Sequence, residues 1–180
     1  MSAAMVLSRA DARFLLVERG EFCGAKNVSG GVLWGTDLAR LVPDYWKSDA
    51  GFERYVNHRR LTLMDETSAF SVDFKSADFD ETPYMGLTVL RARFDEWFAS
   101  QVQLVIEAGS NAEESLLATD ILVEELVQED GRVVGIRTGD EVFHADCVIL
   151  AEGVNNLLTR QIGLEPSNVP ACLLYTSDAA

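Results

Sequence analysis

The chain has 180 residues, of which 48% are hydrophobic and 24% charged, a composition typical of a globular protein with one sizeable core. Its formal net charge of -14 and its scattered basic residues argue against a nucleic-acid partner, because phosphate backbones are bound by clustered Lys and Arg. The three cysteines form no Cys-x-x-Cys pair, so neither a zinc site nor a disulfide framework is predicted. The sequence contains no run of about 18 apolar residues and no signal-peptide pattern, so we expect no transmembrane segment and a cytoplasmic location.

The segment Phe14–Gly20, FLLVERG, has four apolar residues followed by an acid, an arginine and a glycine. This pattern predicts a strand buried on both faces of a parallel sheet. Glu18 would lie at its carboxyl end, where dinucleotide-binding sheets carry an acid that accepts hydrogen bonds from the adenosine ribose. The alternative is a strand that ends in a solvated Glu18–Arg19 pair, since no Gly-x-Gly-x-x-Gly turn occurs about 20 residues upstream. Residues 2–13 have helical spacing, so we expect the chain to begin inside a βαβ unit.

A glycine-rich stretch follows at Glu21–Gly35. Closely spaced glycines permit positive φ angles and a close approach of the backbone to a ligand. We favour a ligand-lining loop over a mobile surface loop, because the stretch directly follows the candidate ribose-binding acid. The residues Asp37–Val42 then predict a short helix, capped by Thr36 and ending before Pro43.

The middle of the chain predicts a hairpin and a long helix. Arg60–Phe74 alternates apolar and polar residues around the turn sequence DETS, which indicates a hairpin in a second sheet. The helix has one apolar face, formed by Phe94, Trp97, Phe98, Val102 and Val105. Arg91 and Arg93 lie at the amino-terminal end of this helix, where guanidinium groups and free backbone amides can hold an anion. The alternative, which the spacing alone favours, is a surface salt bridge with Asp95 or Glu96.

From residue 121 onward the pattern changes to strands. ILVEEL, RVVGIRT and EVFHA predict a three-stranded meander with a tight turn at Asp130–Gly131. Val148–Ala151 predicts a second buried strand, followed by Glu152, Gly153 and a helical pattern, an order typical of a strand-end ligand site. The two histidines lack the spacing of a catalytic or metal site.

Five segments occur in an order and spacing that resemble a known family: LLVERG, GAKNVSGGVLWG, LRARFDEWF, DGRVVGIRT and HADCVILAEGVNNLL. The chain resembles the FAD-dependent oxidoreductases of the glutathione-reductase-like superfamily over most of Ala3–Val169. Within that group it looks most similar to the FixC-type flavoproteins, relatives of electron-transfer-flavoprotein:quinone oxidoreductase and of geranylgeranyl reductases. The resemblance implies an α/β fold, namely a fragment of a glutathione-reductase-like FAD-binding Rossmann fold with a β-meander and part of a second antiparallel-sheet substrate domain.

The resemblance also implies a division of the chain. Residues 1–59 would form a partial FAD-binding domain that lacks its first strand and phosphate loop. Residues 60–90 would belong to the substrate domain, and residues 91–170 would return to the FAD-binding domain. The tail 171–180 fits no pattern and looks like translated sequencing-adapter DNA, the alternative being a frayed native terminus.

The family pattern places FAD against particular residues. In the resemblance, Glu18 and Arg19 lie at the adenosine ribose, Gly24, Gly30 and Gly31 run along the flavin side, Arg91 contacts the cofactor, Val123 offers its backbone to the adenine, and Ala151, Glu152 and Gly153 pass close to the dinucleotide. No catalytic residue and no metal ligand is implied, because this part of such proteins holds the cofactor.

The implied activity is electron transfer through FAD. Electrons would arrive from an electron-transfer flavoprotein and leave to a quinone or a ferredoxin-like protein, with peripheral membrane contact left open. The alternatives are a geranylgeranyl-reductase-like or hydroxylase-like flavoenzyme, and a non-catalytic truncated nucleotide-binding module. We expect the chain alone to bind FAD weakly or not at all.

Overall fold

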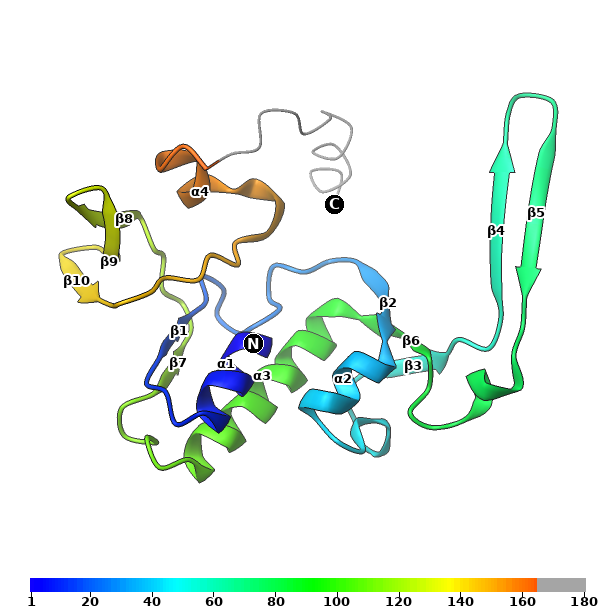
Figure 1. Ribbon diagram of the computed structural model, residues 1–180, viewed down its shortest axis with the longest axis horizontal. Coiled ribbons are helices and arrows are strands. Elements are labelled where there is room, and N and C mark those ends of the chain that lie inside the picture. Colours follow the sequence, from blue (N-terminus) through cyan, green and yellow to red (C-terminus); the bar gives the residue numbers. More distant parts are fainter. Residues whose placement is uncertain (165–180) are drawn as a thin grey trace. The chain divides into compact units, whose positions relative to one another are not determined.

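The computed structural model describes residues 1–164, without the side chain of Val154, and divides into two compact units (Figure 1). The first comprises Met1–Leu16 and Phe22–Leu117, and the second comprises Val17–Glu21 and the chain from Ala118 onward. The expected non-native tail lies outside the described residues. The domain division expected from the family pattern stays a prediction.

An antiparallel sheet forms the centre of the first unit. It consists of β2 (Gly30–Trp34), β6 (Gly86–Leu90) and β3 (Phe52–Tyr55), with β6 between the other two. Because β6 has a partner on each side, it is the most buried of the three, and Leu87 and Val89 each remain only 4% exposed.

Three helices and two short 3-10 turns complete the core of the first unit. The helices are α1 (Ser2–Arg9), α2 (Gly35–Leu41) and α3 (Arg91–Ala108), and the turns are η1 (Tyr45–Lys47) and η2 (Ala77–Asp80). The buried face of α3 packs with α1 and β6 through Ala4, Met5, Leu87, Val89, Phe94, Phe98, Val102 and Ile106. Residues at i, i+4, i+8 and i+12 lie on one side of a helix, so the predicted amphipathic helix is confirmed.

The predicted cap of the second helix is wrong. Helix α2 begins at Gly35, and the capping position is Trp34, which makes no side-chain cap hydrogen bond. Thr36 therefore lies inside the helix. The first residue, Gly35, is closely packed, since a Cβ there would come within 2.0 Å of the Tyr45 hydroxyl and of the Tyr84 carbonyl.

The predicted hairpin is confirmed. Strand β4 (Arg59–Met64) pairs with β5 (Ala69–Phe74) in a two-stranded sheet of its own, and every residue of both strands is exposed. The turn is held by Asp65, whose Oδ1 accepts hydrogen bonds from the backbone N–H groups of Thr67 and Ser68, both at 2.8 Å. These bonds lower the pKa of Asp65 to about 2.

The strand predicted at FLLVERG is present as β1 (Leu15–Val17), which pairs with β7 (Leu116–Ala118). The expectation that it is buried on both faces is wrong, since Leu15 is 37% exposed and Leu16 and Val17 are half-buried. Within the described residues this sheet has two strands, so β1 is an edge strand and not an interior one.

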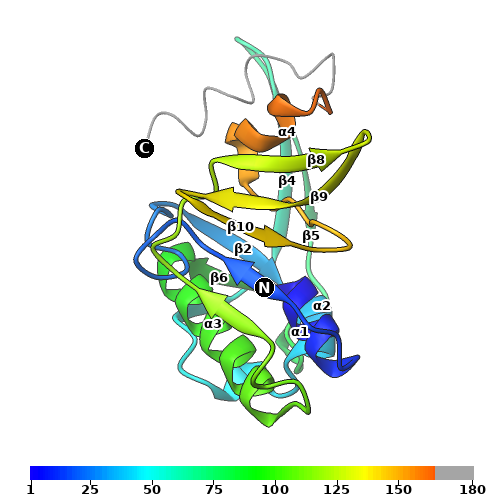
Figure 2. The same cartoon turned by 90° about the vertical axis from the view of Figure 1, so that its left-hand side faces the viewer.

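The second unit contains the meander and a short helix. Strands β8 (Glu125–Glu129), β9 (Arg132–Thr138) and β10 (Glu141–His144) lie side by side, with β9 in the centre (Figure 2). The predicted tight turn is confirmed by the positive φ angles of Asp130 (49°) and Gly131 (77°). The unit ends with η3 (Gly153–Asn155) and α4 (Leu157–Gln161).

The second buried strand, predicted at Val148–Ala151, is wrong. These residues have no strand assignment, and Ile149 is 60% exposed. An apolar strand of a parallel sheet needs a hydrogen-bonding neighbour, and among residues 1–164 no strand pairs with this segment.

Candidate cofactor site

The glycine-rich stretch of the first unit packs on the start of α3. Gly24 has φ +104°, and a Cβ there would lie 2.6 Å from the Ala92 carbonyl oxygen and 3.0 Å from Asp95 Cβ. Any other residue at this position would have to push the loop away from the helix. Gly24 therefore brings the loop backbone against α3.

The end of the same stretch is a strand, which corrects the expectation of a loop throughout Glu21–Gly35. Gly30 and Gly31 begin the edge strand β2 and pair with Leu90 and Val89 of β6. Both glycines are exposed, and a Cβ at Gly31 would meet nothing within 4 Å. The result is a bare segment of backbone at a sheet edge, next to the first turn of α3.

Arg91 forms a salt bridge with the buried carboxylate of Asp95. Its Nη2 lies 2.9 Å from Oδ2 of Asp95, and its Nε lies 3.4 Å from Oδ1. The Asp95 side chain is 6% exposed and the Arg91 side chain 47% exposed. The salt bridge that the spacing favoured is thus present, although its acid is buried and not at the surface.

Sequence reasoning missed the burial of Asp95. The available signal was its position between Phe94 and Phe98, one residue after the first and three before the second, which places it near the apolar face of α3. Asp95 also accepts a hydrogen bond at Oδ2 from Nδ2 of Asn27. A local sequence pattern does not reveal this contact, because the two residues lie far apart in the chain.

In the second unit, Glu18 closes a turn. Its Oε1 accepts a hydrogen bond from the Gly20 backbone N–H at 2.6 Å, while its own backbone pairs with Ala118 and Ile121. The Glu18 side chain is half-buried and Arg19 is exposed. One carboxylate oxygen of Glu18 is thus used to hold the turn from Glu18 to Gly20.

Glu152 caps α4. Its carboxylate accepts hydrogen bonds from the Leu158 N–H (2.9 Å), the Thr159 N–H (2.8 Å) and the Thr159 hydroxyl (2.6 Å). Burial alone would raise the pKa of Glu152, but these hydrogen bonds outweigh it and lower the pKa. The acid that follows residues 148–151 therefore stabilises the start of a helix.

The remaining expected residues of the second unit flank these groups. Val123 is half-buried in the segment before β8, and Ala151 and Gly153 are exposed. Gly153 has φ +75°. Gly24, Gly30, Gly31 and Arg91 belong to the first unit and the other expected cofactor residues to the second.

Among residues 1–164, no group of three His, Cys, Asp or Glu is placed to hold a metal ion. In that same part of the chain, every helix is too short or too polar to cross a membrane.

Sequence comparison identifies the relatives. FixC of Escherichia coli K12 is 40% identical over 162 residues, covering 90% of this chain and 36% of FixC. FixC of Bradyrhizobium diazoefficiens is 38% identical over 172 residues, covering 94% of this chain. The chain is a FixC homologue. It spans 36 to 38% of the length of these FixC proteins, and no protein-family model matches it.

Solved structures share the fold of this FixC homologue. A geranylgeranyl bacteriochlorophyll reductase-like protein from Thermoplasma acidophilum has a TM-score of 0.69 at 18% identity, over 94% of this chain and 40% of that one. The myxobacterial chondrochloren halogenase, a variant of FAD-dependent halogenases, has a TM-score of 0.56 at 20% identity, over 76% of this chain and 30% of that one. The mixed α/β architecture is therefore the one found in an FAD-dependent enzyme.

Proposed function

We propose that the chain is the cofactor-holding part of a FixC-type, FAD-dependent oxidoreductase. The observation that carries this proposal is the 40% identity to FixC over 90% of the chain. The fold similarity to an FAD-dependent halogenase supports the same cofactor.

The first unit has features that fit a flat, anionic cofactor. The backbone at Gly30 and Gly31 is exposed and carries no side chains, so a planar ring system can approach it closely. Helix α3 has no acid in its first turn, and Arg91 lies there with its side chain 47% exposed. A positive charge at a helix amino terminus is unfavourable for the helix, and although Asp95 compensates part of it, the exposed side of the guanidinium can still pair with a bound anion.

In the second unit, the ribose and adenine contacts are assigned to Glu18, Arg19 and Val123. Glu18 uses Oε1 for the Gly20 amide, and a carboxylate offers further acceptor positions to ribose hydroxyls. Ala151, Glu152 and Gly153 would approach the dinucleotide through their backbone. In this proposal, the Glu152 side chain caps α4, and the contact with the cofactor is left to its backbone.

FAD would supply the redox chemistry, and the protein would bind and orient it. We propose that electrons come from an electron-transfer flavoprotein and pass to a quinone or a ferredoxin-like protein, with peripheral membrane contact where a quinone is the acceptor. A geranylgeranyl-reductase-like enzyme is the second candidate, favoured by the TM-score of 0.69 to such a protein over 94% of the chain.

The test begins with the reading frame around the chain. A Gly-x-Gly-x-x-Gly sequence within about 25 residues before Glu18 supports the flavoenzyme, and its absence favours a non-catalytic module. The longer protein is then purified and its flavin absorbance measured. Reduced electron-transfer flavoprotein should bleach the bound flavin, and a quinone should restore it. Bleaching only by a nicotinamide cofactor, with reduction of a prenyl substrate, would support the reductase instead.

A further inference from the structure

The stretch between Phe22 and Ser29 is attached to α3 at successive points along its length. Gly24 packs on Ala92 and Asp95. The Asn27 side chain donates to the Asp95 carboxylate, and the Ser29 carbonyl accepts from the Arg91 backbone N–H at 3.2 Å. We call residues 22–29 the glycine loop.

The glycine loop also has its own internal turn. The Ala25 N–H donates to the Phe22 carbonyl at 3.0 Å, and the Asn27 N–H donates to the Gly24 carbonyl at 2.8 Å. This turn brings the Asn27 side chain over α3 while the neighbouring Lys26 stays exposed. The internal turn and the helix contacts together define one arrangement of the loop.

Asp95 is the group that these contacts share. Its carboxylate binds the loop through Asn27 and the helix entry through Arg91, and the residue is only 4% exposed. A buried carboxylate is costly unless its hydrogen bonds are satisfied. The same carboxylate thus holds both the loop and the arginine, because moving either one leaves this buried group with fewer of its hydrogen bonds.

The position of this carboxylate differs from that of a cofactor ligand. Asp95 is covered, while the half-exposed Arg91 and the exposed Gly30 and Gly31 that follow the loop remain accessible. A buried acid would also repel the phosphates of an anionic cofactor if it touched them. Its contribution to binding therefore comes through the residues it holds.

We infer that Asp95 is a positioning residue for the cofactor: it fixes the glycine loop and Arg91 in the arrangement that receives FAD. This inference rests on the proposed function for its ligand, although the attachment of the loop does not. A loop that is already ordered loses less entropy on binding, so releasing it weakens affinity without removing any contact to the ligand.

Two variants test the inference. Asp95→Asn keeps the size of the side chain but removes its charge and places an amide where Asp95 accepts hydrogen bonds. Asn27→Ala removes only the hydrogen bond from the loop to Asp95 and leaves the Arg91–Asp95 ion pair intact, so it serves where Asp95→Asn fails to fold. The matched controls are Asp37→Asn, whose acid lies on the exposed face of α2 and is 77% exposed, and Asn57→Ala at an exposed position.

The first readout is specific to the loop and needs no flavin. Lys26 lies within the loop, so trypsin cleavage after this residue reports how often the loop leaves the helix. In the 180-residue chain we expect cleavage about tenfold faster in both variants, since a hydrogen bond to a charged group is lost. The thermal midpoint of Asn27→Ala should fall by about 3 to 6 °C, the shift that corresponds to the same tenfold effect, and those of both controls should stay within about 2 °C of the unmodified chain.

The second readout is the dissociation constant for FAD in the longer protein, measured by quenching of flavin fluorescence. We expect it to rise about tenfold in both variants and to stay unchanged in the controls. Faster cleavage with unchanged FAD affinity, or no change in either quantity, overturns the positioning role. Failure of the unmodified longer protein to bind FAD refutes the proposed function, and with it the positioning role.

Discussion

The Glu152 carboxylate accepts two backbone hydrogen bonds and one hydroxyl hydrogen bond at the start of α4, so it acts as the cap of that helix. Because its folded pKa lies below the ordinary value of 4.5, the charged form stabilises the native state above that value. The contribution is lost as the pH falls through the lower, folded pKa.

Replacement of this cap has a measurable consequence. We expect Glu152→Gln to weaken α4 by about 1 kcal/mol at neutral pH, as for the loss of other caps, and to reduce the dependence of its stability on acid. Exchange of the Leu158 and Thr159 amide hydrogens should be faster in the variant at pH 7, while Glu129→Gln, at an exposed strand end, leaves it unchanged. Equal exchange rates in the variant and the unmodified chain would contradict the capping role.

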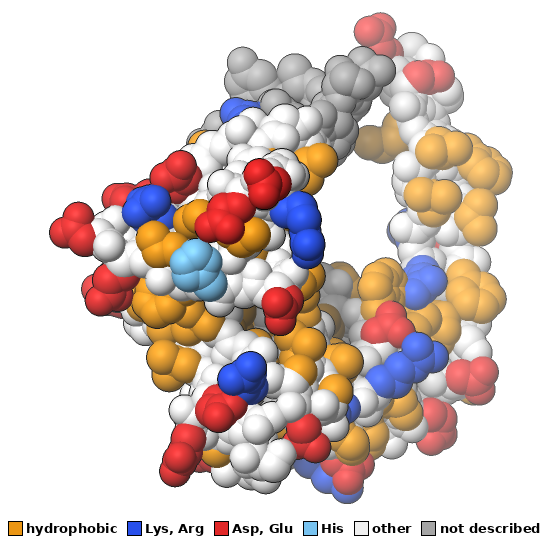
Figure 3. Space-filling model, turned by 60° about the vertical axis from the view of Figure 1, so that its left-hand side comes forward, with side chains coloured by type: hydrophobic (Ala, Val, Ile, Leu, Met, Phe, Trp, Pro, Cys, Tyr) orange, Lys and Arg blue, Asp and Glu red, His pale blue; other side chains and the backbone are white. Residues whose placement is uncertain are grey.

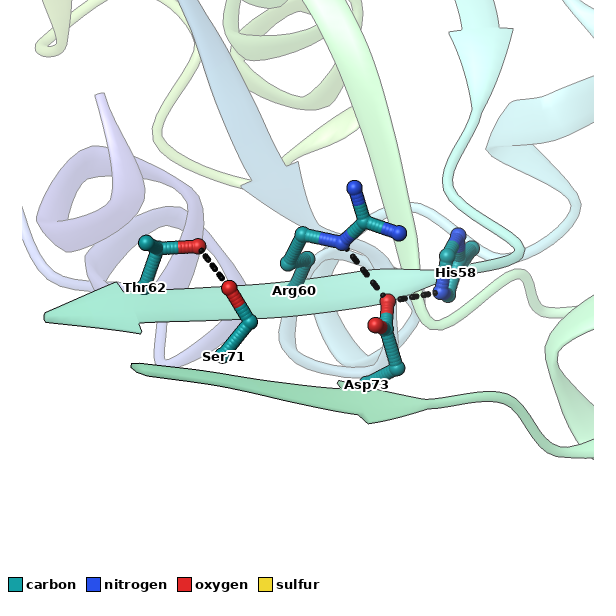
Figure 4. Close-up of polar contacts among 5 residues, drawn as sticks. All are labelled: His58, Arg60, Thr62, Ser71 and Asp73. Atoms are coloured by element: carbon teal, nitrogen blue, oxygen red, sulfur yellow. Dashed lines mark hydrogen bonds and ion pairs between the residues drawn. The ribbon is translucent and has the colours of Figure 1, made fainter. Parts of the chain in front are cut away.

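A second residue whose environment changes its titration is Asp73, on the polar face of the hairpin. Its Oδ1 accepts a hydrogen bond from Arg60 Nε at 2.9 Å and lies 2.7 Å from His58 Nε2 (Figure 4). The Arg60 hydrogen bond is the main reason that the pKa of Asp73 is lowered, with a smaller contribution from His58.

We therefore expect Arg60→Gln to raise the pKa of Asp73 toward its ordinary value, and His58→Gln to raise it less. The measurement is an NMR titration of the Asp73 carboxyl carbon. Arg54→Gln, on β3, is the control and should leave the titration unchanged. A larger effect from His58→Gln than from Arg60→Gln would show that this order of contributions is wrong.

At the scale of elements, the hairpin exposes an unusual amount of apolar surface. Leu61, Leu63, Phe70 and Val72 are 48 to 64% exposed. The register pairs Leu61 with Val72 and Leu63 with Phe70, so all four side chains lie on the same face. In the space-filling view, hydrophobic side chains gather along the hairpin (Figure 3). A contiguous apolar face in water favours association.

We expect the double substitution Leu63→Thr, Phe70→Thr to reduce self-association of the chain while leaving its secondary structure intact. Threonine suits a strand, and exposed apolar residues contribute little to folding. Sedimentation velocity measures the change, and circular dichroism checks the fold. Thr62→Val, on the opposite face, is the control and should not reduce association. Unchanged sedimentation of the double variant would show that this face does not drive association.

The elements that sequence patterns predict well are those whose signal is local. The apolar period of α3 depends on residues such as Phe94 and Phe98 within a few turns, and Asp130–Gly131 specifies its turn by itself. Val148–Ala151 shows the limit, because an apolar run is compatible with a strand but does not reveal whether a neighbour exists to pair with it. Whether Leu15 is buried likewise depends on the number of strands beside β1.

At the scale of the whole molecule, the candidate site likewise contains residues that sequence patterns predict and a contact that they do not. The glycines at residues 30 and 31 and the arginine at residue 91 are visible from the family pattern. The carboxylate that links loop and helix is not, because Asn27 and Asp95 meet only after the chain has folded. The family pattern predicts that Glu152 lies near the cofactor, but it does not reveal that the side chain of this residue accepts hydrogen bonds from Leu158 and Thr159 at the start of α4.

The sequence contains no Gly-x-Gly-x-x-Gly turn, the element whose backbone amides compensate a pyrophosphate. Arg91 already shares its charge with Asp95, so this arginine does not replace the backbone amides of that turn. Each charge-assisted hydrogen bond to a phosphate contributes about 1.5 to 3 kcal/mol, and the loss of two of them weakens binding by at least about 100-fold. We thus expect the 180-residue chain to bind FAD at least that much more weakly than a longer protein that contains the turn. Titration of FAD fluorescence with each protein measures the difference, and a yellow complex of the 180-residue chain that survives gel filtration would contradict it.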